Sequence, residues 1–135
     1  MHSTALYALE LRNFKCFREQ RIKFGMLTVL SGLNGVGKSS VIQALLLLRQ
    51  SFSESPTQER LQLSGDLVGL GTGQDVLFDL ADEDKLTFIL EFAGGRRDEY
   101  AFSYSRKVVD FHLNAKLVMS TGPKGKPLRT RVTTG

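Results

Sequence analysis

Residues 32–39 carry the pattern G-x-x-x-x-G-K-[ST], which strongly limits how the surrounding chain can fold. Its glycines let the backbone curl so that successive N–H groups point inward at phosphate oxygens. Lys38 provides a positive charge for the outer phosphates, and the hydroxyl of Ser39 suits a Mg²⁺ ion that bridges them. The pattern therefore predicts a phosphate-binding P-loop (Walker A motif), with a strand before it and a helix after it.

The flanking residues fit that prediction. Residues 26–31 are apolar and β-branched, as in a buried strand. Residues 40–49 contain no Pro or Gly and predict a helix that is apolar nearly all round, hence buried on several sides. The predicted nucleotide-binding residues are Gly32, Leu33, Asn34, Gly35, Val36, Gly37, Lys38, Ser39 and Ser40.

The rest of the chain predicts mainly strands. These cover residues 5–11, 21–24, 85–92, 99–104 and 111–118, while residues 58–63 fit either a strand or a helical turn. The last three strands should form an antiparallel meander. The expected fold is α/β: the N-terminal lobe of a P-loop NTPase, with a mixed sheet, a buried P-loop helix and this meander. Two strands before the P-loop, and strands rather than βα units after its helix, favour the head of an ABC-type ATPase over a small kinase or a GTPase.

Charge is distributed unevenly along the chain. The protein has 135 residues, enough for one modest domain. Five of its 18 Lys and Arg residues follow Asp110 with no acid among them, which leaves 13 basic and 14 acidic residues before that point. We expect an ATPase lobe over residues 1–119 and a flexible basic tail over residues 120–135. The tail could contact phosphates of a nucleic acid or could be a solvated linker.

The composition also suggests a compartment. Cys16 is the single cysteine, so no intramolecular disulfide is possible and a reducing compartment is expected. The first residues lack the features of a signal peptide, and the longest apolar run is too short to cross a bilayer. The sequence therefore predicts a cytoplasmic protein with no membrane partner.

The opening of the chain resembles a known family. Residues 9–17, 22–24 and 27–40 are similar to the N-terminus of RecF/SMC/OLD-like ATPases, which share L-x-N-F-[KR]-x-F, then I-x-F, then G-x-N-G-x-G-K-[ST]. Residues 42–51 are similar to bacterial predicted ATPases of the same superfamily. The resemblance implies ATP and Mg²⁺ as cofactors, and two heads that pair with ATP between them.

The same resemblance implies further site residues. Asn13, Phe14 and Lys15 would line the base or ribose side of the nucleotide. Gln74, which lies between the helix and a later strand, would be a Q-loop residue whose amide oxygen contacts Mg²⁺ or the attacking water. The alternative is that Gln74 is an ordinary polar loop residue.

Other motifs of these ATPases are not evident in the 135 residues. Asp79 and Asp110 follow apolar residues but lack the four-residue apolar run and the following Glu of a Walker B strand, and no signature motif occurs. Tyr100, Phe102, Tyr104 and Phe111 have strand spacing and are expected in the core rather than as base-stacking groups. No catalytic residue is assigned. Three functions stay open: an ATP-binding lobe whose hydrolysis needs motifs from elsewhere, a non-catalytic remnant that pairs with a full-length ATPase, and an atypical P-loop kinase.

Overall fold

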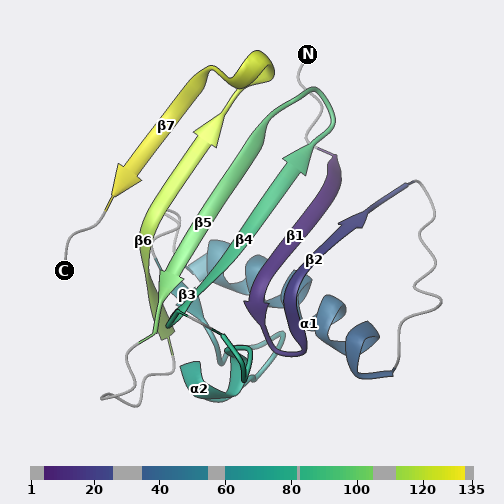
Figure 1. Cartoon of the computed structure of the whole chain (residues 1–135), viewed down its shortest axis with the longest axis vertical. Coiled ribbons are helices and arrows are strands. Elements are labelled where there is room, and N and C mark those ends of the chain that lie inside the picture. The colour runs from purple at the N-terminus through teal and green to yellow at the C-terminus, as the bar shows by residue number, and fades with distance from the viewer. Residues whose placement is uncertain (1–4, 26–34, 55–59, 82, 105–111, 133–135) are drawn as a thin grey trace.

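A sheet with one long helix on one of its faces forms the protein (Figure 1). The computed structural model describes residues 5–25, 35–54, 60–81, 83–104 and 112–132. Its elements are β1 (Leu6–Phe14), β2 (Phe17–Lys23), α1 (Gly35–Glu54), β3 (Arg60–Gln62), α2 (Gly73–Val76), β4 (Lys85–Phe92), β5 (Arg97–Ser103), β6 (His112–Thr121), the 3-10 turn η1 (Pro123–Gly125) and β7 (Pro127–Val132).

The described strands form one sheet in the order β2-β1-β4-β5-β6-β3, and β7 also pairs with β6. All the pairings among them are antiparallel. The meander expected from the sequence is confirmed, with Tyr100 of β5 between Phe88 of β4 and Val118 of β6. The expected mixed sheet depended on a strand at 26–31, which lies outside the described residues.

Several element boundaries differ from the sequence expectation. β1 continues to Phe14, beyond the expected end of the strand at residue 11, because Asn13 tolerates the left-handed backbone angle of φ 58° while the strand pairing goes on. Helix α1 begins at Gly35, inside the glycine-rich pattern, and has 20 residues. The ambiguous stretch at 58–63 contains a short strand, β3.

The core lies between α1 and one face of the sheet. Fully buried Phe88 makes edge-on ring contacts with Phe14 at 5.4 Å and with Phe102 at 6.1 Å between centroids. Phe52 of α1 packs on Tyr100 with ring centroids 5.2 Å apart. The prediction that Tyr100 and Phe102 are core residues is therefore confirmed, whereas Phe111 lies outside the described residues. Aromatic pairs of this kind contribute about 0.5–1.5 kcal/mol each beyond the area that they bury.

Side chains near the C-terminal end of α1 bind the backbone of residues 62–68 by hydrogen bonds. The side chain of Gln50, which is 3% exposed, donates to the carbonyl oxygens of Gln62 and Val68 and accepts from the N–H groups of Leu67 and Val68, at 2.8 to 3.1 Å. The hydroxyl of buried Ser51 accepts from the N–H of Gln62 at 2.8 Å. One amide thus satisfies four backbone groups that have no partner in a regular ladder.

The C-terminal part of the chain joins the sheet. β7 pairs with β6 from Leu117↔Val132 to Thr121↔Pro127, through a turn in which Lys124 and Gly125 have positive φ. This differs from the flexible tail expected from residue 120. Residues with few apolar neighbours in sequence can still form a strand where an unpaired edge offers a full set of backbone hydrogen bonds.

Replacing Gln50 by Ala should destabilise the protein by about 2–3 kcal/mol, because four backbone groups lose a hydrogen bond to a buried side chain, although the Val68 carbonyl keeps its bond from the N–H of Gly65. The change in the free energy of unfolding is measured by urea unfolding monitored by circular dichroism. The matched control is Gln20→Ala on β2, whose amide has one described bond, to the carbonyl of Arg21; it should change stability by no more than about 0.5 kcal/mol. Equal effects of the two substitutions would contradict the role given to Gln50.

Candidate nucleotide-binding groove

The turn between β1 and β2 is joined to the segment around α2 by a short antiparallel link. The N–H of Lys15 donates to the carbonyl of Val76 at 2.7 Å, and the N–H of Phe78 donates to the carbonyl of Asn13 at 2.9 Å. Phe14 and Leu77, between these bonds, form an isolated β-bridge and are both buried. Positions about 60 residues apart in the chain are thereby held side by side.

A groove of about 610 Å³ lies where this link meets the first turns of α1. Three segments line it: the β1–β2 turn, the start of α1 and the segment 75–79. The lining residues are Lys15, Cys16, Ser39, Ser40, Gln43, Asp75, Leu77 and Asp79. The structure thus brings Ser39 and Ser40 of the predicted P-loop into a concave site shared with residues far away in sequence.

The P-loop residues differ in their exposure. Lys38 is half-buried, Ser39 is exposed, and Ser40 is buried. The thiol of Cys16 donates to the hydroxyl of Ser40 at 3.7 Å, which connects the β1–β2 turn to the helix. Gly32, Leu33 and Asn34 lie outside the described residues, and Gly35 and Val36 are described by their backbone alone. The hydroxyl that the sequence assigns to Mg²⁺, that of Ser39, therefore remains accessible in the groove.

Two carboxylates, those of Asp75 and Asp79, also line the groove. Oδ2 of Asp75 accepts hydrogen bonds from the N–H of Thr72 at 2.7 Å and from its hydroxyl at 3.0 Å. These two bonds, with a smaller contribution from the charge of Lys15, hold the pKa of Asp75 below its ordinary value. A side chain at Gly71 would be strained, because its φ is 84°, and a Cβ there would displace the Asp75 carboxylate. Asp75 therefore stays charged at neutral pH.

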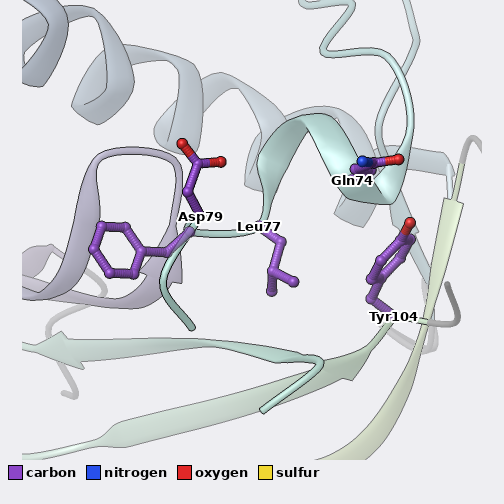
Figure 2. A pocket seen from close by; sticks show the side chains of 5 residues that line it. Gln74, Leu77, Asp79 and Tyr104 are labelled. Atoms are coloured by element: carbon purple, nitrogen blue, oxygen red, sulfur yellow. The ribbon is translucent and has the colours of Figure 1, made fainter. Parts of the chain in front are cut away.

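Gln74 lies beside a neighbouring cavity. That cavity, of about 260 Å³, is lined by Gln74, Leu77, Phe78, Asp79 and Tyr104. In Figure 2, Gln74 and Tyr104 stand on one side of it and Asp79 on the other. Asp79 and Leu77 border both hollows, whereas Gln74 lines the second and Ser39 the first. Asp79 therefore lines the same groove as Ser39, whereas Gln74 lines the neighbouring cavity.

The three residues implied for the base or ribose side separate in the structure. Lys15 lines the groove. Phe14 is fully buried against Phe88, and Asn13 uses its side-chain amide to donate to the carbonyl of Lys85 at 3.1 Å. Phe14 and Asn13 therefore support the turn that presents Lys15 and Cys16.

Sequence reasoning did not single out Cys16, Gln43 or Asp75 as site residues. Gln43 lies one helical turn after Ser39, so an i, i+4 reading of α1 from Ser39 would have found it. Thr72 and Asp75 have the spacing of a capping box, which is visible in the sequence, but the groove that Asp75 borders depends on the long-range link to the β1–β2 turn.

The groove suits phosphates and a hard cation. It combines the start of a 20-residue helix, whose dipole favours anions, with the accessible Ser39 hydroxyl and two carboxylates that could face a cation. Within the described ranges, no cluster of three or more His, Cys, Asp or Glu residues has metal-binding geometry. The donor set therefore fits a metal held jointly with phosphate oxygens better than a metal held by protein alone.

A family model described as an AAA ATPase domain matches residues 5–107. That span is well over half of the chain and includes the groove, and the chain belongs to this family. Nucleotide binding follows from the membership, and ATP with Mg²⁺ is what the family generally binds. A search of curated proteins found no match. In the part of the chain that the structure describes, neither helix has the length and apolar character needed to span a membrane.

The stability of the protein should depend on the charge of Asp75. Because the pKa of Asp75 is lower in the folded state, its contribution is present above the unfolded pKa of about 3.9 and is lost as the pH falls through the folded value. Chemical unfolding at pH 6 and at pH values below 4 should show a smaller acid-induced loss for Asp75→Asn than for wild type. Asp66→Asn, which removes an exposed carboxylate nearby in the chain, is the control. Identical acid profiles for wild type and Asp75→Asn would show that the Thr72 bonds do not hold in solution.

Proposed function

We propose that the chain binds Mg²⁺–ATP through residues 32–40 as the N-terminal lobe of an ABC-type ATPase of the RecF/SMC/OLD-like group. The observation that carries the proposal is the groove in which Ser39, at the start of α1, meets the β1–β2 turn and residues 75–79. Family membership supports nucleotide binding in general. The finer assignment rests on the motif order over residues 9–40.

Each residue has a definite role in this proposal. Lys38 holds the outer phosphates, the backbone N–H groups of residues 32–40 bind the inner ones, and Ser39 coordinates Mg²⁺. Mg²⁺ supplies charge neutralisation of the phosphates when bound. The groove needs that cation, because the carboxylates of Asp75 and Asp79 would otherwise repel a phosphate chain in the same space. Binding should therefore require the metal.

Hydrolysis is assigned to an assembly and not to these residues alone. The Walker B strand and the signature motif of such ATPases are not found in the 135 residues, so we propose that a second lobe or partner head supplies them in the cytoplasm. The isolated chain should bind ATP with slow or no turnover. A non-catalytic subunit would bind ATP in the same way, and a multiple-turnover assay of the chain with a candidate partner ATPase distinguishes the two.

Removing the charge of Lys38 should abolish most of the affinity. Calorimetric titration with Mg²⁺–ATP should give a sub-millimolar dissociation constant for wild type, weakened about tenfold or more in Lys38→Ala, which corresponds to at least about 1.4 kcal/mol. Lys23→Ala, which removes an exposed lysine from β2, is the charge-matched control and should bind like wild type. EDTA should abolish binding. No measurable heat for folded wild type at concentrations that detect sub-millimolar binding would refute the proposal.

A further inference from the structure

A second groove lies at the end of the sheet where β4 turns into β5. It has a volume of about 520 Å³ and shares none of its described lining residues with the nucleotide-binding groove. The side chains that line it include those of Tyr7, Glu91, Phe92, Arg96 and Arg97. We call it the turn groove. Figure 1 shows the β4–β5 turn at the opposite end of the sheet from α2.

Two aromatic side chains give the turn groove an apolar surface. Tyr7 is 46% exposed, and Phe92 is half-buried. The guanidinium of Arg96 lies over the Phe92 ring, with 5.3 Å between its central carbon and the ring centroid. Gly94 and Gly95, which also line the groove, have no side chain that could cover the rings. The turn groove therefore presents aromatic carbon next to a fixed positive charge.

Hydrogen bonds hold both arginines of the turn groove and leave part of each guanidinium available. Nε and Nη2 of Arg96 donate to the buried carboxylate of Asp98 at 3.1 and 2.7 Å, and Nη1 of Arg97 donates to a neighbouring carboxylate at 3.2 Å. Among the described residues, Nη1 of Arg96 and the Nε and Nη2 of Arg97 have no hydrogen-bond partner. Glu91 is already bound by Arg21 at 2.6 Å. The groove therefore suits a carboxylate better than a cation.

An exposed leucine with acidic neighbours lies before β4. Leu80 is 69% exposed, the largest value among the large apolar side chains described. Its carbonyl accepts a hydrogen bond from Arg18 at 3.3 Å, which helps to hold this segment in place. Asp79 and Glu83 are both exposed, and the Glu83 side chain stays 68% exposed although Lys85 lies 3.4 Å away. We call Asp79, Leu80 and Glu83 the acidic tip. A single exposed leucine is ordinary, but its combination with carboxylates is what the turn groove can bind.

The turn groove and the acidic tip of one chain lie too far apart to meet. Glu83 lies two residues before β4, and Phe92 of the turn groove is the last residue of that strand. The eight residues of β4 span about 24 Å. Figure 1 shows β4 running from the end of the sheet near α2 to the β4–β5 turn. A contact between the two surfaces therefore joins two copies of the chain.

We propose that the turn groove binds the acidic tip of a second copy of this chain. Leu80 packs on Tyr7 and Phe92, which removes apolar surface of both copies from water. Carboxylates of the tip accept hydrogen bonds from the available N–H groups of Arg96 and Arg97. The contact is head-to-tail, because each copy uses its groove for one neighbour and its tip for another. It needs no nucleotide, unlike the pairing of two ATPase heads with ATP between them.

Sedimentation velocity without nucleotide tests the proposal. The mean sedimentation coefficient of wild type should rise with protein concentration between about 10 and 500 μM. Leu80→Asp in the tip and Tyr7→Ala in the groove should each weaken the association about tenfold or more, since each removes a central apolar contact. The matched control is Leu67→Asp, which changes a leucine that is 45% exposed and lies outside both surfaces. It should associate like wild type.

A mixture of the two variants separates a lost contact from a lost fold. Leu80→Asp keeps an intact groove, and Tyr7→Ala keeps an intact tip. One copy of each therefore forms a single complete head-to-tail contact. The equimolar mixture should form dimers and no larger species, and it should associate more strongly than either variant alone. Unfolding of either variant could not produce this result.

Wild type that stays monomeric over the whole concentration range would overturn the proposal. Equal weakening by Leu67→Asp would do the same, as would a mixture that associates no better than its separate components. A synthetic peptide with the sequence of residues 77–86 tests the remaining alternative, an acidic segment of a different protein. Binding of this peptide by a wild type that does not self-associate would assign the turn groove to such a partner and contradict the proposed contact.

Discussion

The candidate groove depends on two backbone hydrogen bonds, Lys15 N–H to the Val76 carbonyl and Phe78 N–H to the Asn13 carbonyl. They hold the β1–β2 turn against residues 76–78, with Phe14 and Leu77 buried between. Without this link, residues 76–78 and the β1–β2 turn would not be held together opposite the start of α1, and the groove would not form. Because the link is made by backbone atoms, these two segments can keep their positions even when the side chains that line the groove change.

Local patterns predicted the elements that depend on local physics. The apolar run of β4 was located to the residue, at 85–92, and the helix after the glycine-rich pattern was found because nothing in residues 40–49 interrupts it. The meander followed from the alternation of apolar and polar residues, and in the structure Gly94 and Gly95, between β4 and β5, both have positive φ. These features are decided within a few residues, which is why sequence reasoning reaches them.

The features that sequence reasoning missed depend on long-range pairing. β7 forms because the edge of β6 offers partners to a polar, Pro-containing segment whose composition suggested a tail. The four bonds of Gln50 and the position of Asp75 in the groove depend on how residues 60–79 return to α1. Gln74 and Asp75 are neighbours in sequence, yet they border different hollows. The sequence pattern of the four-residue helix α2 could not show which of the two side chains would line the groove with Ser39.

The central claim is that three distant segments form one nucleotide site, and the reactivity of Cys16 tests it most directly. Cys16 is the single cysteine of the chain, is exposed, and lines the groove with Ser39. Saturating Mg²⁺–ATP should slow the modification of its thiol by a maleimide severalfold in wild type and leave the rate unchanged in Lys38→Ala. A rate unaffected by Mg²⁺–ATP, in wild type that calorimetry shows to be saturated, would place the nucleotide elsewhere and contradict the account.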